Sequence, residues 1–379
     1  MRSALRILAA LLLLAGSAAA YAAAQPVPPP PTLQATSWVL VDNQSGQTLA
    51  GHRENEAVEP ASITKLMTAY AVFQALRQGK VKLDTEVPIS ERAWRSEGSR
   101  TYLDLNSRVP VEVLIQGMIV QSGNDATIAL AEAVAGTEDT FAALMNQYAE
   151  RLGMSQSHFQ NSTGLPGANH KMSVADIAKL TRAIIREFPE YYRWYSQREF
   201  TWNNIRQPNR NGLLARDSSV DGVKTGMTEA AGYCLVSSAK RDGMRLIAVV
   251  TGTKSMKARE DASLALLNYG FSFYETRVLR KAGTELAVHR IYKAPGGHAA
   301  VGVAEDLAVT LPRGRADRVE YQMELARVFA PLTKSDQVGV LRATLDGKVI
   351  AEAPLRPLAD VPRGNIFRRI WDTILSWFD

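Results

Sequence analysis

The chain has 379 residues, 46% of them hydrophobic and 22% charged, which is an ordinary globular composition in a chain long enough for two domains. Its formal net charge of +6 is spread without a long Lys/Arg block, which argues against a nucleic-acid groove. Weak attraction to anionic phospholipid or to an acidic polymer fits this charge better. The single cysteine, Cys234, excludes an intramolecular disulfide and lies in an apolar strand pattern that favours a buried core thiol.

The N-terminus has the pattern of an export signal. Arg2 and Arg6 precede an apolar run from Ile7 to Ala15, which a series of small residues follows. The apolar core of about ten residues is well short of the roughly 20 needed to cross a bilayer, so a cleaved signal peptide over residues 1–24 is favoured over a retained anchor. Cleavage after Ala20 is the alternative. We therefore expect an exported protein.

Residues 33–275 are expected to form one α+β domain, preceded by an extended Pro-rich linker over 25–32. Strand patterns at its two ends enclose a helical middle, and Asp242-Gly243 is a strong hairpin signal. The expected strands are Ser37–Asp42, Thr48–His52, Tyr233–Lys240 and Arg245–Thr251, with strand character resuming after Lys224. The expected helices are Ser62–Arg77, Val111–Gln121, Ala126–Val134, Thr137–Arg151, Val174–Glu187 and Arg259–Tyr274.

After Thr276 the pattern changes to short alternating runs separated by Gly, Pro and Asp, which predicts a small all-β domain over 276–361. This region contains no cluster of catalytic residue types, and Asp346-Gly347 marks one of its hairpins. The expected strands are Glu285–Ile291, Leu307–Leu311, Val319–Leu325, Val338–Leu345 and Lys348–Ala353.

The last segment, residues 362–379, predicts an amphipathic helix. Fifteen residues span about 22 Å, too short to cross the hydrocarbon core, but aromatic side chains beside arginines suit a helix lying in the membrane interface. The alternative is a terminal helix docked on the protein's own core. We favour membrane anchoring because the run is very apolar and terminal. Its apolar side holds Ile366, Phe367, Ile370, Trp371, Ile374, Trp377 and Phe378.

The segment Ser62-Ile63-Thr64-Lys65 opens the first expected helix. Residues three apart share a helical face, which holds the Lys65 amine beside the Ser62 hydroxyl. The positive end of the helix dipole and partial burial disfavour a charged amine, so Lys65 is a candidate base for a Ser62 nucleophile. The ordinary alternative for Ser62 is a helix N-cap. The same spacing recurs at Ser237 and Lys240, but in a strand pattern, where the two side chains point to opposite faces.

Two further motifs follow in chain order. Ser122-Gly123-Asn124 lies between two expected helices, in a turn that can project both polar side chains into a cleft. Lys224-Thr225-Gly226 stands at the start of a strand, where Gly226 would let substrate backbone approach closely. Each motif alone is an ordinary turn or strand edge, but together with Ser62 and Lys65 they form an ordered set of catalytic signatures.

This set resembles the motifs of the penicillin-binding, active-site serine enzymes, and most closely those of the low-molecular-mass D-alanyl-D-alanine carboxypeptidases. Other segments are similar to the same family, so the resemblance covers nearly the whole mature chain: Asn161–Leu165, Asn209–Leu214, Asp221–Gly226 and Ala231–Cys234.

The resemblance implies a β-lactamase/transpeptidase-like catalytic domain with serine-type D-Ala-D-Ala carboxypeptidase activity. The substrates would be peptidoglycan stem peptides, and β-lactam antibiotics would acylate the serine. The enzyme would lie on the periplasmic side of the cytoplasmic membrane, held there by the C-terminal helix.

The resemblance also implies the roles of the catalytic side chains. Ser62 would attack the carbonyl between the two terminal D-alanines while Lys65 accepts its proton. Ser122 would relay a proton to the leaving amine, assisted electrostatically by Lys224. Asn124 would bind the backbone amide of the substrate.

The substrate carboxylate and the oxyanion have implied partners as well. Thr225, next to Gly226, would meet the terminal carboxylate with Arg259 as a second anchor, because arginine can bind a carboxylate in bidentate fashion. The backbone N–H groups of Ser62 and Met227 would form the oxyanion hole. Relatives often carry a polar or imidazole side chain where Met227 stands, so substrate preference and deacylation rate are not transferred. Arg210 also matches a family motif and is interpreted as structural or as a support for the residues that contact the substrate.

The sequence disfavours some alternative functions and leaves one open. The five histidines show no ligand spacing, so neither a metal nor another cofactor is expected. A class A β-lactamase needs a loop glutamate, and Glu199 with Asn203 offers that pattern only at a position too close to Lys224. A D,D-endopeptidase would use the same site with a larger leaving group. A binding protein without activity is disfavoured by the complete set of catalytic side chains.

Overall fold

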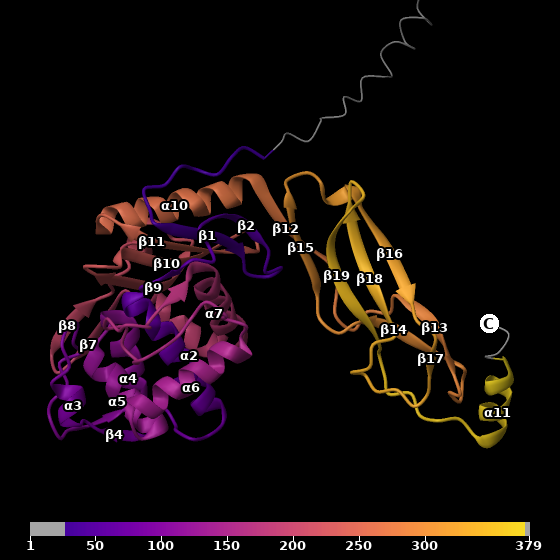
Figure 1. Cartoon of the computed structure of the whole chain (residues 1–379), viewed down its shortest axis with the longest axis horizontal. Coiled ribbons are helices and arrows are strands. Elements are labelled where there is room, and N and C mark those ends of the chain that lie inside the picture. Colours follow the sequence, from indigo (N-terminus) through magenta and orange to yellow (C-terminus); the bar gives the residue numbers. More distant parts are fainter. Residues whose placement is uncertain (1–26, 376–379) are drawn as a thin grey trace, which may run out of the picture.

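The computed structural model describes residues 27–375, which form two parts joined end to end (Figure 1). The expected signal peptide therefore lies outside the described residues. The first part is built on a five-stranded antiparallel sheet in the order β2-β1-β11-β10-β9. Its strands are β1 (Ser37–Asp42), β2 (Thr48–His52), β9 (Val220–Thr228), β10 (Gly232–Arg241) and β11 (Met244–Thr253).

Helices cover both faces of this sheet, as the α+β prediction requires (Figure 1). The inner strand β1 illustrates why both faces need cover. Val39 packs into the core under the helical cluster, while Leu40 packs into the core under α10. Both faces are buried, so β1 is an unbroken buried run. The helices are α2 (Lys65–Arg77), α3 (Glu91–Trp94), α4 (Val111–Gln116), α5 (Asn124–Ala135), α6 (Glu138–Arg151), α7 (Val174–Glu187), α8 (Pro189–Tyr192), α9 (Leu213–Arg216) and α10 (Met256–Phe273).

The sheet corrects one expected boundary. Strand β9 begins at Val220, before Lys224, because Val223 pairs with Ser237 and Gly222 pairs with Ser238 of β10. The sequence Asp221-Gly222 has turn character, and the ladder to β10 overrides it. The β10–β11 hairpin is confirmed, with Asp242 and Gly243 both at positive φ.

Cys234 is buried in β10, as expected for a core thiol, and burial raises the pKa of the thiol to about 11.

Two expected helices are interrupted near the catalytic motifs. Ser62 lies in a 3₁₀ turn, η1 (Ala61–Thr64), and α2 begins only at Lys65. The run after Val111 ends in a π-helical turn, η2 (Gly117–Gln121), just before Ser122. Both irregularities are typical of functional sites. The remaining short elements of this part are β3 (Ala57–Val58), β4 (Glu86–Pro88), β5 (Arg108–Pro110), β6 (Met172–Ser173), η3 (Arg193–Ser196), β7 (Glu199–Trp202) and β8 (Ile205–Pro208).

The second part is all-β and ends in α11 (Ile366–Leu375), which lies at the end far from the catalytic part (Figure 1). A two-stranded sheet, β12-β15, adjoins a six-stranded sheet in the order β16-β18-β19-β14-β13-β17. The elements are β12 (Tyr274–Arg280), β13 (Ala287–Tyr292), β14 (His298–Val303), β15 (Leu307–Pro312), η4 (Ala316–Arg318), β16 (Val319–Leu325), β17 (Val328–Phe329), β18 (Gly339–Leu345) and β19 (Lys348–Pro357).

The described part of the Pro-rich segment packs against the fold. Val27 and Leu33 contact the α10 side of the core, and the hydroxyl of Tyr269 donates a hydrogen bond to the carbonyl of Pro28 at 2.9 Å. Among residues 27–375, no helix combines the length and the hydrophobicity needed to cross a bilayer.

Candidate active site

The nucleophile segment holds Lys65 directly against Ser62. In a 3₁₀ turn residues three apart eclipse one another, so the Lys65 amine lies over the serine. Lys65 Nζ is 3.0 Å from Ser62 Oγ and donates to the Thr163 carbonyl at 2.7 Å. Ala61, just before the serine, is a non-glycine residue at positive φ, a conformation that concentrates at functional sites.

The environment of Lys65 favours the neutral amine. Its side chain is only 1% exposed, and burial, helped by the positive charge of Arg210, lowers its pKa to about 7. A neutral amine at hydrogen-bond distance from a serine hydroxyl is competent to accept its proton near neutral pH.

Ser122 and Lys224 form a second serine–lysine contact in the same site. Ser122 takes the left-handed conformation at the end of η2, which turns its side chain toward β9. Lys224 Nζ donates to Ser122 Oγ at 2.9 Å and to the Thr225 carbonyl at 3.1 Å. Burial, and then the charges of nearby cations that include Lys65, lower the pKa of Lys224 well below its usual value. Each lysine therefore opposes protonation of the other.

Asn124 presents an unsatisfied acceptor at the start of α5. Its Nδ2 donates to the Glu97 carbonyl at 2.6 Å, and its backbone N–H donates to the Ser99 carbonyl at 2.7 Å. Its buried Oδ1 has no hydrogen-bond partner within residues 27–375. Since buried polar atoms are nearly always paired, this oxygen is suited to accept an N–H from a bound molecule.

A loop stabilised by Glu138 supplies the carbonyl that binds Lys65. Glu138 accepts hydrogen bonds from the backbone N–H and the hydroxyl of Ser162, at 3.0 and 2.6 Å, and forms an ion pair with Arg92 at 2.7 Å. Burial alone would raise the pKa of this carboxyl, but these hydrogen bonds lower it. A side chain on Gly164, which has positive φ, would collide with the Ala61 carbonyl, so this glycine lets the loop pack on the nucleophile segment.

His170 contacts the nucleophile segment through Thr64. The backbone N–H of Gln160 donates to its Nδ1 at 3.1 Å, so the ring proton lies on Nε2, which donates to Thr64 Oγ1 at 2.8 Å. Burial lowers the pKa of His170 to about 4, which keeps the ring neutral at physiological pH. Neither His170 nor Glu138 stands in a recognisable motif, so their roles in the site could not be predicted from the sequence.

Gly226 allows a close approach between two segments of the chain itself. A β-carbon on this residue would lie 3.0 Å from the Pro60 carbonyl and 3.1 Å from Ile63 Cγ1. Its lack of a side chain therefore lets β9 pack against the chain's own nucleophile segment. Thr225 is nearly buried beside it, whereas the Met227 side chain is 56% exposed at the rim of the site.

Two arginines lie on this side of the site. The buried Arg259 guanidinium donates to the carbonyls of Gly226, Cys234 and Arg210 at 3.3 to 3.4 Å, and burial lowers its pKa. The exposed Arg210 side chain has no hydrogen-bond or ion-pair partner in the described part of the chain. The sequence favoured a structural or supporting role for Arg210, and the structure places Arg210 on the lining of the cavity.

These residues surround a cavity of about 490 Å³. Lys65 and Lys224 are absent from its lining and lie buried behind the two serines. Glu199 lies outside the cavity as well, in the β7–β8 hairpin, where it pairs with Arg206 at 2.7 Å. The predicted residues on the lining are Ser62, Ser122, Asn124, Thr225, Gly226, Met227 and Arg259, and Arg210 joins them.

Comparison with known proteins agrees with this geometry. A family model described as D-alanyl-D-alanine carboxypeptidase matches residues 22–255, and one described as penicillin-binding protein 5, C-terminal domain, matches residues 274–363. The chain is 41% identical over 355 residues to the D-alanyl-D-alanine carboxypeptidase DacA of Escherichia coli, covering 91% of this chain and 88% of DacA. It is 40% identical over 356 residues to DacC of the same organism, covering 92% of this chain and 89% of DacC.

Solved structures match most or part of this architecture. Penicillin-binding protein 5 of Haemophilus influenzae superposes with a TM-score of 0.83 at 41% identity, covering 88% of this chain and 99% of that one. Penicillin-binding protein D2 of Listeria monocytogenes, solved in its ampicillin-bound form, has a TM-score of 0.60 at 27% identity, covering 64% of this chain and all of that one. The chain therefore belongs to the D-alanyl-D-alanine carboxypeptidase family of low-molecular-mass penicillin-binding proteins.

Proposed function

We propose that Ser62 is the nucleophile with which this serine-type D-Ala-D-Ala carboxypeptidase removes the terminal D-alanine from peptidoglycan stem peptides. The observation that carries the assignment is the 3.0 Å contact between Ser62 Oγ and a buried Lys65 amine whose pKa is about 7. Ser62 Oγ attacks the penultimate carbonyl carbon and its proton passes to Lys65 Nζ. The new C–O bond gives a tetrahedral intermediate, whose oxyanion the backbone N–H groups of Ser62 and Met227 stabilise.

Collapse of this intermediate breaks the C–N bond and releases D-alanine. The leaving amine takes a proton from Ser122, which lies within hydrogen-bond reach of Lys224 and regains a proton as Lys65 gives up the one that it accepted. Water then gives a proton to Lys65 and attacks the acyl carbon, and Ser62 recovers its proton from Lys65 as the shortened peptide leaves. The two lysines lie behind the cavity wall, so the substrate meets the two serine hydroxyls and not the amines.

Three features support the binding mode of the substrate. The unpaired Oδ1 of Asn124 accepts an N–H of the peptide backbone. Thr225 donates to the terminal carboxylate, and Arg259 supplies positive charge behind it. Arg210 is the more available guanidinium, because it lines the cavity and its side chain has no hydrogen-bond or ion-pair partner within 27–375.

The acyl-enzyme chemistry also accounts for inhibition by β-lactams. Ampicillin and cefotaxime are bound in structures of the Listeria relative, and a β-lactam ring presents a strained amide to the same nucleophile. In this protein we assign the acylated group to Ser62. The Ser62→Ala variant is expected to lose labelling by a fluorescent penicillin while it keeps the melting temperature of the wild type.

The direct test is incubation with a cell-wall pentapeptide while free D-alanine is measured. Wild type is expected to release D-alanine, and Ser62→Ala is not. Cutting of cross-linked dimers without release of D-alanine would instead show a D,D-endopeptidase. Rapid steady-state hydrolysis of penicillin would show a β-lactamase, although Glu199 is committed to the hairpin ion pair.

We further infer that α11 attaches the exported enzyme to the periplasmic surface of the membrane. The helix contacts the β-domain through its polar side, where the buried Asp372 accepts hydrogen bonds from the Lys293 N–H at 2.5 Å and from Arg368 Nε at 3.1 Å. Its apolar side faces away, with Phe367 80% and Trp371 58% exposed. This orientation argues against a helix docked on its own core.

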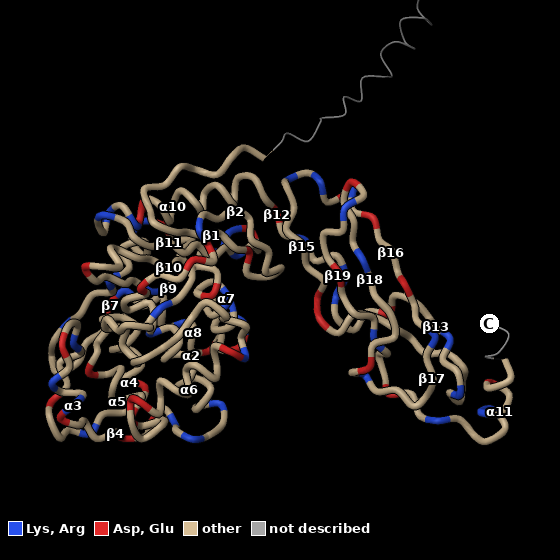
Figure 2. Tube along the Cα trace, in the orientation of Figure 1, with Lys and Arg blue, Asp and Glu red and all other residues tan. Residues whose placement is uncertain are grey.

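The charge around α11 supports the same inference. Figure 2 shows Lys and Arg positions on α11 and at the neighbouring end of the β-domain. An apolar helical face flanked by cations suits a surface of anionic phospholipids. The last predicted aromatic residues, Trp377 and Phe378, lie outside the described residues.

A further inference from the structure

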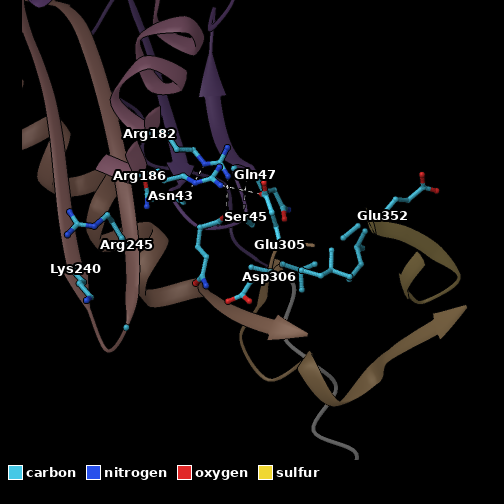
Figure 3. A pocket seen from close by; sticks show the side chains of 18 residues that line it. Asn43, Ser45, Gln47, Arg182, Arg186, Lys240, Arg245, Glu305, Asp306 and Glu352 are labelled. Atoms are coloured by element: carbon cyan, nitrogen blue, oxygen red, sulfur yellow. Dashed lines mark hydrogen bonds and ion pairs between the residues drawn. The ribbon is translucent and has the colours of Figure 1, made fainter. Parts of the chain in front are cut away.

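A second and larger cavity lies where the catalytic part meets the β-domain (Figure 3). Its volume is about 960 Å³, and it shares no lining residue with the catalytic cavity. One wall comes from the β1–β2 turn, α7 and the β10–β11 hairpin. The other comes from the loop before β15 and from β19. Junctions between domains are a preferred location for ligand sites.

The catalytic wall of this cavity carries Arg182, Arg186, Lys240 and Arg245, and within residues 27–375 only Arg245 pairs with a carboxylate of the same wall, Asp221 at 2.7 Å. Arg182 and Arg186 lie one turn apart on α7, a like-charge spacing that destabilises a helix. Arg182 Nε and Nη2 donate to the carbonyls of Asn43 and Gln44 at 2.6 and 3.0 Å, and this guanidinium forms no ion pair within 27–375. Lys240, on the hairpin, is exposed and lines the same cavity.

The opposite wall is acidic. Figure 3 shows Glu305 and Asp306 reaching the cavity from the β-domain on the side of the cationic residues, while the Glu352 side chain points away from them. Two of these carboxylates already have partners, since Asp306 accepts the Ala282 N–H and Glu352 pairs with an arginine of β18. Glu305 is 82% exposed and meets Arg186 only at 3.5 Å. A ligand can therefore compete for both members of this loose pair.

We propose that this cavity binds a second stretch of cell-wall peptide, with a free carboxylate on Arg186 and Lys240 and a free amine on Glu305. The inference rests on the proposed function, because that function brings the enzyme to a polymer whose peptides carry both free carboxylates and the amines of diamino acids. Guanidinium groups suit carboxylates, and the opposite wall suits an ammonium group. A polymer held here presents its other stem peptides to Ser62 at high effective concentration.

The binding test uses full-length protein whose catalytic cavity is filled by acylation with penicillin. Peptidoglycan oligomers solubilised with a muramidase are titrated into this protein by calorimetry. The acylated wild type is expected to bind them, and an Arg186→Glu/Lys240→Glu double variant to bind about tenfold more weakly or worse. The matched control is Lys80→Glu, which reverses an exposed charge at the end of α2. This control is expected to bind like wild type.

An activity test separates this proposal from the proposed function. The double variant is expected to release D-alanine from a single soluble pentapeptide at the wild-type rate, but to show a higher KM on polymeric peptidoglycan. The proposal is overturned if the acylated wild type does not bind the oligomers, or if the double variant matches Lys80→Glu in binding and KM. Failure of wild type itself to release D-alanine from the pentapeptide would count against the carboxypeptidase assignment, and the calorimetric result would stand.

Discussion

The amine of Lys65 lies 3.0 Å from the hydroxyl oxygen of Ser62, inside a wall that leaves the lysine 1% exposed. In water a lysine amine is almost wholly protonated at pH 7 and cannot accept a proton. Here burial lowers its pKa to about 7, so a large share of the molecules carry a neutral amine at that pH. Proton transfer from Ser62 to Lys65 should therefore depend on pH.

Acylation of Ser62 is expected to accelerate as pH rises and to level off above about pH 7. Only the neutral Lys65 accepts the serine proton, so below its pKa of about 7 the rate should fall roughly tenfold for each pH unit. Stopped-flow measurement of acylation by a fluorescent penicillin between pH 5 and 9 checks this. Lys65→Arg keeps a cation but cannot supply a neutral base, so it is expected to lose about 10²- to 10⁴-fold in rate. A rate that stays constant from pH 5.5 to 7 would exclude Lys65 as the base.

Glu138→Ala is expected to weaken both the fold and the catalytic site. The substitution leaves the buried N–H of Ser162 without its acceptor, which costs about 1 to 3 kcal/mol of unfolding free energy. It also loosens the loop whose Thr163 carbonyl holds Lys65, so acylation should slow as well. Chemical denaturation and penicillin acylation rates measure the two effects.

Asp139→Ala is the matched control for this variant, because it removes an exposed carboxylate from the next position of α6. We expect the control to behave like wild type. If Glu138→Ala loses stability but acylates at the wild-type rate in its folded state, the loop does not position Lys65.

Arg210→Gln is expected to lower kcat/KM by about 10- to 100-fold for a peptide that ends in a free carboxylate, the loss typical of a hydrogen bond to a charged group. The same variant should lower turnover of the corresponding peptide amide much less, because that substrate lacks the charge and feels only the loss of the Arg210 effect on the pKa of Lys65. Arg206→Gln, on the exposed β7–β8 hairpin, is the control. Equal losses on the acid and on the amide would mean that Arg210 supports the cavity wall and does not bind the carboxylate.

Contacts between residues that are close in the sequence could be predicted from the sequence. The Ser62–Lys65 spacing predicted their contact because a single helical turn determines it, and the hairpin at Asp242-Gly243 follows from the backbone preferences of two residues. The second Ser-x-x-Lys copy was also dismissed correctly. Ser237 is buried and Lys240 exposed within one strand.

Contacts between residues that are far apart in the sequence could not be predicted from the spacing of the motifs. Lys224 reaches Ser122 across 102 positions of sequence, and Lys65 reaches the Thr163 carbonyl across 98. Such contacts arise when the helical cluster packs against the sheet, which no local pattern encodes. Glu138 is an example, since in the sequence it is an ordinary acidic residue of the first helical turn.

Trp371→Asp is expected to weaken binding of the full chain to phosphatidylglycerol-containing vesicles by about 10- to 100-fold, since it replaces a large exposed apolar side chain on α11 with a charge. Asn365→Asp is the control, because it adds the same charge at the start of the helix and retains the side-chain oxygen that accepts the Arg368 N–H at 2.9 Å. Co-sedimentation measures both variants. Truncation before Pro362 should abolish vesicle binding altogether while D-alanine release from a soluble pentapeptide continues. If the truncated protein still sediments with the vesicles, the membrane attachment lies elsewhere in the chain.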